Sequence, residues 1–132
     1  MIVLDEQLLG RNLETEIAEW YEGKVCFITD LRPNTVIKDD AIPKLLREQN
    51  HAAFITINEK DFWRKVKIAD DFCLICFALA DSRANEISSM LRSLFRHPLF
   101  HTKSQRMGKV IRVAAPAISY YSFDDKRVRN IE

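Results

Sequence analysis

The sequence has little glycine, proline or cysteine, and it has no long apolar run. Among 132 residues, three are glycine and four are proline, so no low-complexity linker is expected. No stretch reaches the ~18 apolar residues of a membrane helix. Asp5 also interrupts the N-terminus, where a signal peptide would be apolar. We therefore expect a cytoplasmic protein with no membrane segment.

The three cysteines form an odd set within apolar runs, which does not favour a disulfide framework. Cys73 and Cys76 have the C-x-x-C spacing of redox proteins. A redox motif, however, needs a helix N-terminus to lower the thiol pKa, and this pair lies in a strand-like run. All three cysteines are predicted to be buried structural thiols.

Charge is distributed unevenly along the chain, although the net charge is only +1. Residues 1–81 carry 10 basic and 15 acidic groups, whereas residues 82–132 carry 10 basic and 4 acidic groups. The first part is suited to binding cations, and the second to facing an anionic polymer or an acidic partner. A solvated surface is the alternative interpretation of both.

Short apolar runs alternate with segments of helical periodicity. Strands are predicted at 2–4, 25–28, 52–57 and 72–79, and a last strand or hairpin around Pro116 at 109–113 and 117–121. Helices are predicted at 8–20, from Asp39 or Asp40 onwards, and at 83–96 with Ser82 as the cap; 61–63 opens a short turn or helix. Residues 1–123 are predicted to form one domain, followed by a polar, frayed tail at 124–132.

This alternation predicts an α/β fold, with a central, mostly parallel sheet in a three-layer α/β/α sandwich. The strand at 72–79 is apolar on both faces and is expected to be central. In such sheets, binding sites form beyond the carboxyl ends of the strands.

Acidic side chains recur where the predicted strands end. Asp5 and Glu6, Asp30, and then Asn58 and Asp61 follow strands one to three, and Asp39 and Asp40 start the helix before strand three. Oxygen ligands gathered in this way select Mg²⁺ or Mn²⁺. Each residue taken alone is better explained as a helix cap or a polar loop residue, whereas the set together favours a metal site.

Three segments resemble a short bacterial PIN-like family related to VapC-type toxins. Residues 2–8, IVLDEQL, resemble the family's opening LLDENL. Residues 39–42, DDAI, resemble D-x-x-I, and residues 53–62, AFITINEKDF, resemble T-x-D-x-D-F or its variant T-x-N-x-x-D-F. These pieces match in order and approximate spacing across residues 1–63, and the remainder fits by architecture.

The resemblance implies a metal-dependent ribonuclease of the PIN-like type. It implies Asp5, Asp39 and Asp61 as catalytic metal ligands, with Asp40 as an alternative to Asp39. Asn58 stands where the common pattern has an acid, and it brings an oxygen without a charge. Glu6, Asp30 and Glu59 are candidates for the family's fourth acid.

The predicted partners are RNA and, for a toxin, an antitoxin protein; a homodimer is a further possibility. RNA-binding candidates are basic residues on or after the long helix: Arg83, Arg92, Arg96, Lys103, Arg106 and Lys109. Trp63 either stacks a base or packs beneath the turn after the third strand. The alternative function is a PIN-like module without activity that binds protein or RNA.

Overall fold

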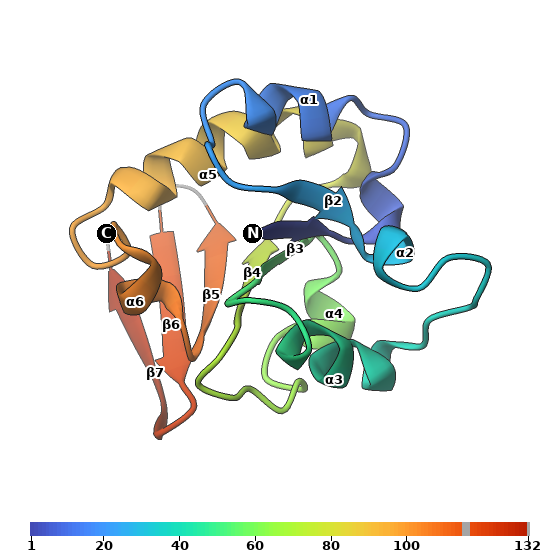
Figure 1. Cartoon of the computed structure of the whole chain (residues 1–132). Helices are drawn as coiled ribbons and strands as arrows, with labels where there is room; N and C mark the ends of the chain where they lie inside the picture. The colour runs from blue at the N-terminus through green and yellow to red at the C-terminus, as the bar shows by residue number, and fades with distance from the viewer. Residues whose placement is uncertain (115–116, 132) are drawn as a thin grey trace.

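The computed structural model describes residues 1–114 and 117–131, which are built around one seven-stranded sheet of order β2-β1-β3-β4-β5-β6-β7 (Figure 1). The strands are β1 Ile2–Leu4, β2 Val25–Phe27, β3 Ala53–Thr56, β4 Cys73–Phe77, β5 Lys109–Ala114, β6 Ala117–Ser122 and β7 Asp125–Ile131. Every pairing from β2 to β5 is parallel, and the two pairings that add β6 and β7 are antiparallel. The prediction of a mostly parallel α/β sheet is confirmed.

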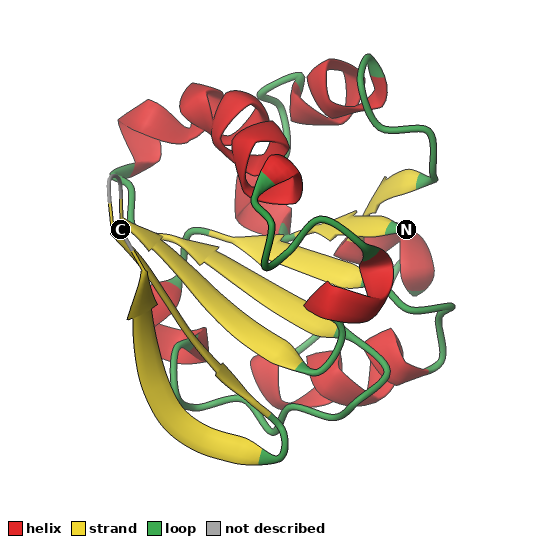
Figure 2. Ribbon diagram, turned by 90° about the vertical axis from the view of Figure 1, so that its left-hand side faces the viewer, coloured by secondary structure: helices red, strands yellow, loops and turns green. Residues whose placement is uncertain are grey.

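Helices cover both faces of this sheet, as Figure 2 shows. They are η1 Glu6–Leu8, α1 Leu13–Ala18, α2 Ile28–Leu31, η2 Asp39–Ala41, α3 Ile42–Arg47, α4 Glu59–Phe62, η3 Asp81–Glu86, α5 Ile87–Arg96 and α6 Lys103–Arg106, where η denotes a 3₁₀ helix. Apolar residues of α1 and α5 belong to one core, and those of α3 and α4 belong to a second core across the sheet. In the described part of the chain, no helix has the length and apolar character needed to cross a membrane.

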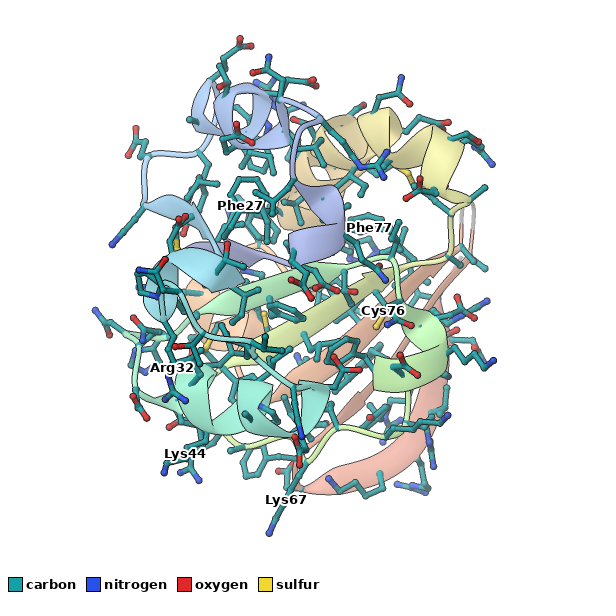
Figure 3. All side chains as sticks on the ribbon, turned by 90° about the vertical axis from the view of Figure 1, so that its right-hand side faces the viewer. Phe27, Arg32, Lys44, Lys67, Cys76 and Phe77 are labelled. Carbon is teal, nitrogen blue, oxygen red and sulfur yellow. The ribbon has the colours of Figure 1, made fainter. Side chains whose placement is uncertain are left out.

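Strand β4 shows how the sequence forms two cores. It is the fourth of the seven strands, and all five of its residues are buried. Because side chains alternate along a strand, Phe77 enters one core and Cys76 the other; they lie on opposite sides of the sheet in Figure 3. The cysteines are free and buried as predicted, and burial raises the pKa of Cys73 to about 12.

Most predicted strands differ from those in the structure by one or two residues at an end, and three further differences concern the helices. The helix expected at 8–20 is confined to α1, because Gly10 and Asn12 adopt left-handed backbone conformations with φ of 78° and 62°. Ile28 opens α2 instead of ending β2. Ser82 does not cap the long helix: it lies within η3, whose N-cap is Ala80 and which runs directly into α5.

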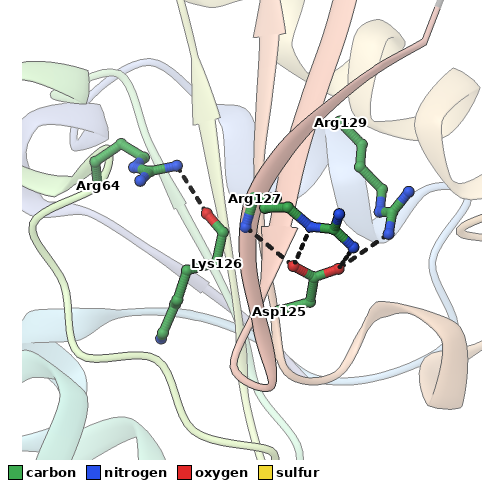
Figure 4. Close-up of polar contacts among 5 residues, drawn as sticks. All are labelled: Arg64, Asp125, Lys126, Arg127 and Arg129. Carbon is green, nitrogen blue, oxygen red and sulfur yellow. Dashed lines mark hydrogen bonds and ion pairs between the residues drawn. The ribbon is translucent and has the colours of Figure 1, made fainter.

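The prediction of a frayed tail was wrong for residues 125–131, which form β7 against β6. Figure 4 shows Asp125 shared by Arg127 and Arg129, while Arg64 donates to the Lys126 carbonyl at 3.0 Å. The polar composition of the tail reflects an outer strand whose charges discourage further pairing, not an absence of structure. Residues 115–116, which include Pro116, and Glu132 lie outside the described residues.

Candidate functional site

The carboxyl ends of β1 and β3 place Asp5 beside Thr56. The Asp5 backbone N–H donates to the Ile55 carbonyl at 2.9 Å, which continues the pairing of the two strands. The Thr56 hydroxyl then donates to Asp5 Oδ2 at 2.6 Å. Thr56 is fully buried and Asp5 is only 6% exposed, so the position of this carboxylate is fixed by the sheet.

Asn58 connects this pair to Asp61 at the start of α4. Its backbone N–H donates to the Thr56 hydroxyl at 2.9 Å, and its Oδ1 accepts from the Asp61 N–H at 3.3 Å, so it caps the helix. Its Nδ2 donates to Asp61 Oδ2 at 2.8 Å. Both ends of the Asn58 amide are therefore engaged within the protein, and one oxygen of Asp61 is held toward it.

Asp39 lies close enough to Asp5 and Asp61 for their charges to interact. Burial is the main cause that raises the pKa of Asp5, and the charges of Asp39 and Glu6 raise it further against hydrogen bonds from Thr56 and the Glu6 backbone. The pKa of Asp39 is raised by partial burial and then by Asp61. The three acids implied by the resemblance thus share one edge of the sheet and repel one another.

The other predicted acids have partners or positions of their own. Asp30 Oδ2 accepts from the Phe27 N–H at 2.8 Å and so caps α2. Glu59 pairs with Arg112 at 3.2 Å. Asp40 is exposed and lines two grooves, one beside α3 with Lys44 and one with Asp39 and Asp61. These contacts account for Asp30 and Glu59 without any ligand.

The donor chemistry at this edge fits a hard divalent cation, because the interacting side chains offer only oxygen atoms. A groove of about 320 Å³ opens next to Asp39 and Asp61. Within residues 1–114 and 117–131, however, no three acidic, histidine or cysteine side chains are grouped closely enough to hold an ion. The charges of Asp5, Asp39 and Asp61 therefore interact, but the three side chains do not form a preformed metal site. The metal site stays a prediction.

The basic residues predicted to bind RNA do not gather at this edge. Arg83 forms an ion pair with Glu86 at 2.7 Å. Arg92 and Arg96 instead line a groove with Lys103 and Arg106. That groove lies near the amino end of β1, since Lys103 and Arg106 act electrostatically on the Met1 amine. Lys109 donates to the Gln105 carbonyl at 2.6 Å.

Two side chains require a change of interpretation. Sequence reasoning did not single out Thr56, although a hydroxyl residue ending an apolar strand beside Asp5 was a usable signal. Trp63 packs against Tyr121 with ring centroids 5.4 Å apart, which is the packing alternative.

Comparison with known proteins identifies no relative of the chain. No known protein family matches the sequence, and no characterised protein or solved structure is significantly similar to it. The PIN-like resemblance therefore depends on its motif residues and on the site described above.

Proposed function

We propose that this chain is a metal-dependent ribonuclease of the PIN-like type, which hydrolyses phosphodiester bonds in RNA. The observation that carries the proposal is a buried carboxylate, Asp5, at the carboxyl end of β1, whose pKa is raised partly by Asp39. An acid that only caps a helix or lies on the surface does not have to be placed close to other acids. Acids that repel one another in a protein are a common feature of metal and catalytic sites.

In this proposal Asp5, Asp39 and Asp61 hold Mg²⁺ or Mn²⁺, and Asn58 or Asp40 supplies a further oxygen. A bound ion of this kind activates water for attack on phosphorus and neutralises developing charge. The protein's own contribution is positioning: Thr56 fixes the orientation of Asp5, and the Asn58 amide fixes that of Asp61. Asp39, on the exposed turn η2, is the least constrained of the three and would complete the site by moving toward the others.

The wider fold is consistent with this proposal. A mostly parallel sheet with helices on both faces has its natural site beyond the carboxyl ends of its strands, where these acids lie. The toxin role, with an antitoxin as partner, is the part of the proposal that depends on the family resemblance alone.

A second candidate is a PIN-like module without activity, and one observation favours it. Asn58, which replaces an acid of the common pattern, uses its Oδ1 to cap α4 and its Nδ2 to bind Asp61. A residue engaged in this way contributes to local structure and adds no charge to a metal site.

Cleavage of a labelled RNA separates the two candidates. With Mg²⁺ or Mn²⁺, we expect the parent protein to cleave and Asp5→Asn to lose about 100-fold or more in rate, because a charge that positions the ion is removed. Asp30→Asn is the matched control: it makes the same acid-to-amide change at this edge, and the amide oxygen can still cap α2.

A folded parent that never cleaves, and whose Tm does not respond to Mg²⁺ or Mn²⁺, would favour the inactive module. An Asp5→Asn protein that cleaves like the parent would remove Asp5 from the proposed site.

A further inference from the structure

A second groove lies at the opposite edge of the sheet from Asp5. It has a volume of about 560 Å³ and is formed by residues 20–23, which follow α1, and by residues of α5, of α6 and of the loop between them. Met1, which precedes β1, donates from its amine to the Tyr21 hydroxyl of this groove at 2.7 Å, whereas Asp5 follows β1. Since β1 spans three residues, at about 3.3 Å per residue, the two sites are on the order of 10 Å or more apart.

The groove is lined by a buried cation, Arg106, that has no carboxylate partner among the described residues. Arg106 is 8% exposed, and its guanidinium carbon lies 3.8 Å from the centre of the Phe95 ring. Its Nη1 donates to the carbonyls of Phe100 and His101, both at 3.0 Å, while its buried Nε has no partner. A buried charge of this kind is costly unless an anion accompanies it.

The groups that surround Arg106 do not supply that anion. Burial lowers the pKa of Arg106, and among the described titratable groups Cys73 and Tyr21 are those that act in the opposite direction. Burial raises the pKa of both of these neighbours, so each is neutral near pH 7. The charge of Arg106 is therefore uncompensated by the described protein.

Three exposed cations extend the same groove. Arg92 and Arg96 are four residues apart on α5 and share a face, and Lys103 begins α6. Glu22 is the single acid lining this groove. Four like charges beside one another destabilise a protein, and a phosphate group would relieve this repulsion because guanidinium groups bind it through paired, charge-assisted hydrogen bonds.

We propose that this groove binds phosphate groups of single-stranded RNA, at a site separate from the acidic edge. The buried guanidinium of Arg106 anchors one phosphate, and Arg92, Arg96 and Lys103 contact its neighbours. Trp20 and Tyr21 line the groove and are half-buried, which favours RNA over an acidic peptide because a base can stack on an aromatic ring. The choice of RNA as the source of phosphate rests on the proposed function; the phosphate site itself does not.

Binding is tested by fluorescence anisotropy with a labelled, single-stranded RNA oligonucleotide in EDTA, so that no cleavage occurs. We expect Arg92→Glu/Arg96→Glu to raise the Kd about tenfold or more, with a weaker dependence on salt. The matched control is Arg32→Glu/Lys44→Glu, which makes the same charge change at two exposed residues that line neither this groove nor the one beside Asp39 and Asp61 and that are labelled in Figure 3. Its Kd should stay within about twofold of the parent, since these residues touch no phosphate in the proposal.

Thermal melting identifies the ligand and does not depend on cleavage. Inorganic phosphate and AMP should each raise the Tm of the parent more than chloride at equal ionic strength, and should do so less in Arg92→Glu/Arg96→Glu. A parent Tm that responds to phosphate no more than to chloride would overturn the phosphate site. Equal loss of RNA binding in both double variants would overturn the groove.

Polyglutamate that binds as tightly as RNA would assign the groove to an acidic protein and overturn the choice of RNA. RNA binding is measured in EDTA, without the metal that the acidic edge needs for cleavage. Failure of the ribonuclease proposal, seen as absent cleavage, is therefore distinguishable from failure of this groove, seen as absent binding.

Discussion

The two edges of the sheet carry buried charges of opposite sign. At the carboxyl edge Asp5 is held by the Thr56 hydroxyl, and at the amino edge Arg106 is held by two backbone carbonyls. Both charges are fixed by neutral hydrogen-bond partners, and neither has an opposite charge beside it among the described residues. Hydrogen bonds to neutral groups orient a charge without neutralising it, so each edge is prepared for a charged ligand.

The two edges differ in which elements of the chain supply their charged residues. The acids at the carboxyl edge follow from strand ends within residues 1–61, because parallel strands deliver their last residues to one place. The cations at the amino edge come from α5 and α6, which are brought together by the chain reversal between them. The opposite charges of the two parts of the sequence therefore correspond in part to opposite ends of one sheet, with Arg83 and Glu22 as exceptions.

The largest expected effect is a difference in cleavage rate between variants of two adjacent acids at the carboxyl edge. Asp39→Asn should lower the rate of metal-dependent RNA cleavage about 100-fold, because Asp39 interacts with both Asp5 and Asp61. Asp40→Asn should change the rate less than about threefold: Asp40 lines the groove that Asp39 and Asp61 share, but it is exposed and, unlike Asp39, is not among the causes that raise the pKa of Asp5. Equal losses in the two variants would mean that η2 turns Asp40 toward the ion.

The next effect concerns the amino edge. Arg106→Lys should lower stability by about 1–2 kcal/mol, because an ammonium cannot keep the stacking on Phe95 together with the two hydrogen bonds that Nη1 donates to the Phe100 and His101 carbonyls. Chemical denaturation measures this change. Arg96→Lys is the control, since Arg96 is exposed and keeps its charge. If Arg106→Lys is as stable as the parent, Arg106 is not the fixed anchor that the groove requires.

Much of the fold could be predicted from sequence because its signals are local. The two-sided apolar character of β4 and the alternation of strands and helices were sufficient for the sheet. Prediction failed where tertiary contacts decide: β7 is polar and forms because β6 offers it an edge, and α1 starts late because Asn12 adopts a left-handed conformation.

The two sites were predictable to different degrees. Strand ends indicated Asp5 and Asp61, and the family resemblance joined them with Asp39 into one set. The hydrogen bond from Thr56 to Asp5 joins residues 51 positions apart and was missed. The groove around Arg106 has no comparable pattern. Its burial depends on where α6 packs against Phe95, and nothing in the spacing of basic residues indicates that packing.

A smaller effect should appear in the dependence of stability on pH. A raised pKa of Asp5 in the folded state means that folding favours its protonated form. This stabilising contribution is present below the usual value of 3.8 and is lost as pH rises through the raised pKa. In EDTA, Asp5→Asn should therefore gain Tm relative to the parent as pH rises from about 4 to 7. A difference in Tm that is constant with pH would contradict this; Asp30→Asn serves as the control.

The smallest expected effect tests whether RNA crosses the carboxyl edge beyond the acids. Arg83 lies in η3, after β4, and both its Nε and Nη2 donate to the carboxylate of Glu86 at 2.7 and 2.8 Å. Its charge is therefore offset within one turn, and the pair is exposed and screened by salt. Arg83→Ala should change the Kd for the RNA oligonucleotide in EDTA by less than about twofold and the Tm by about 1 °C or less.

Arg92→Ala is the comparison, because it removes another exposed arginine from the amino-edge groove and should weaken binding more. If Arg83→Ala weakens binding as much as Arg92→Ala, then RNA contacts both edges, and the separation of an acidic site from a basic groove is wrong.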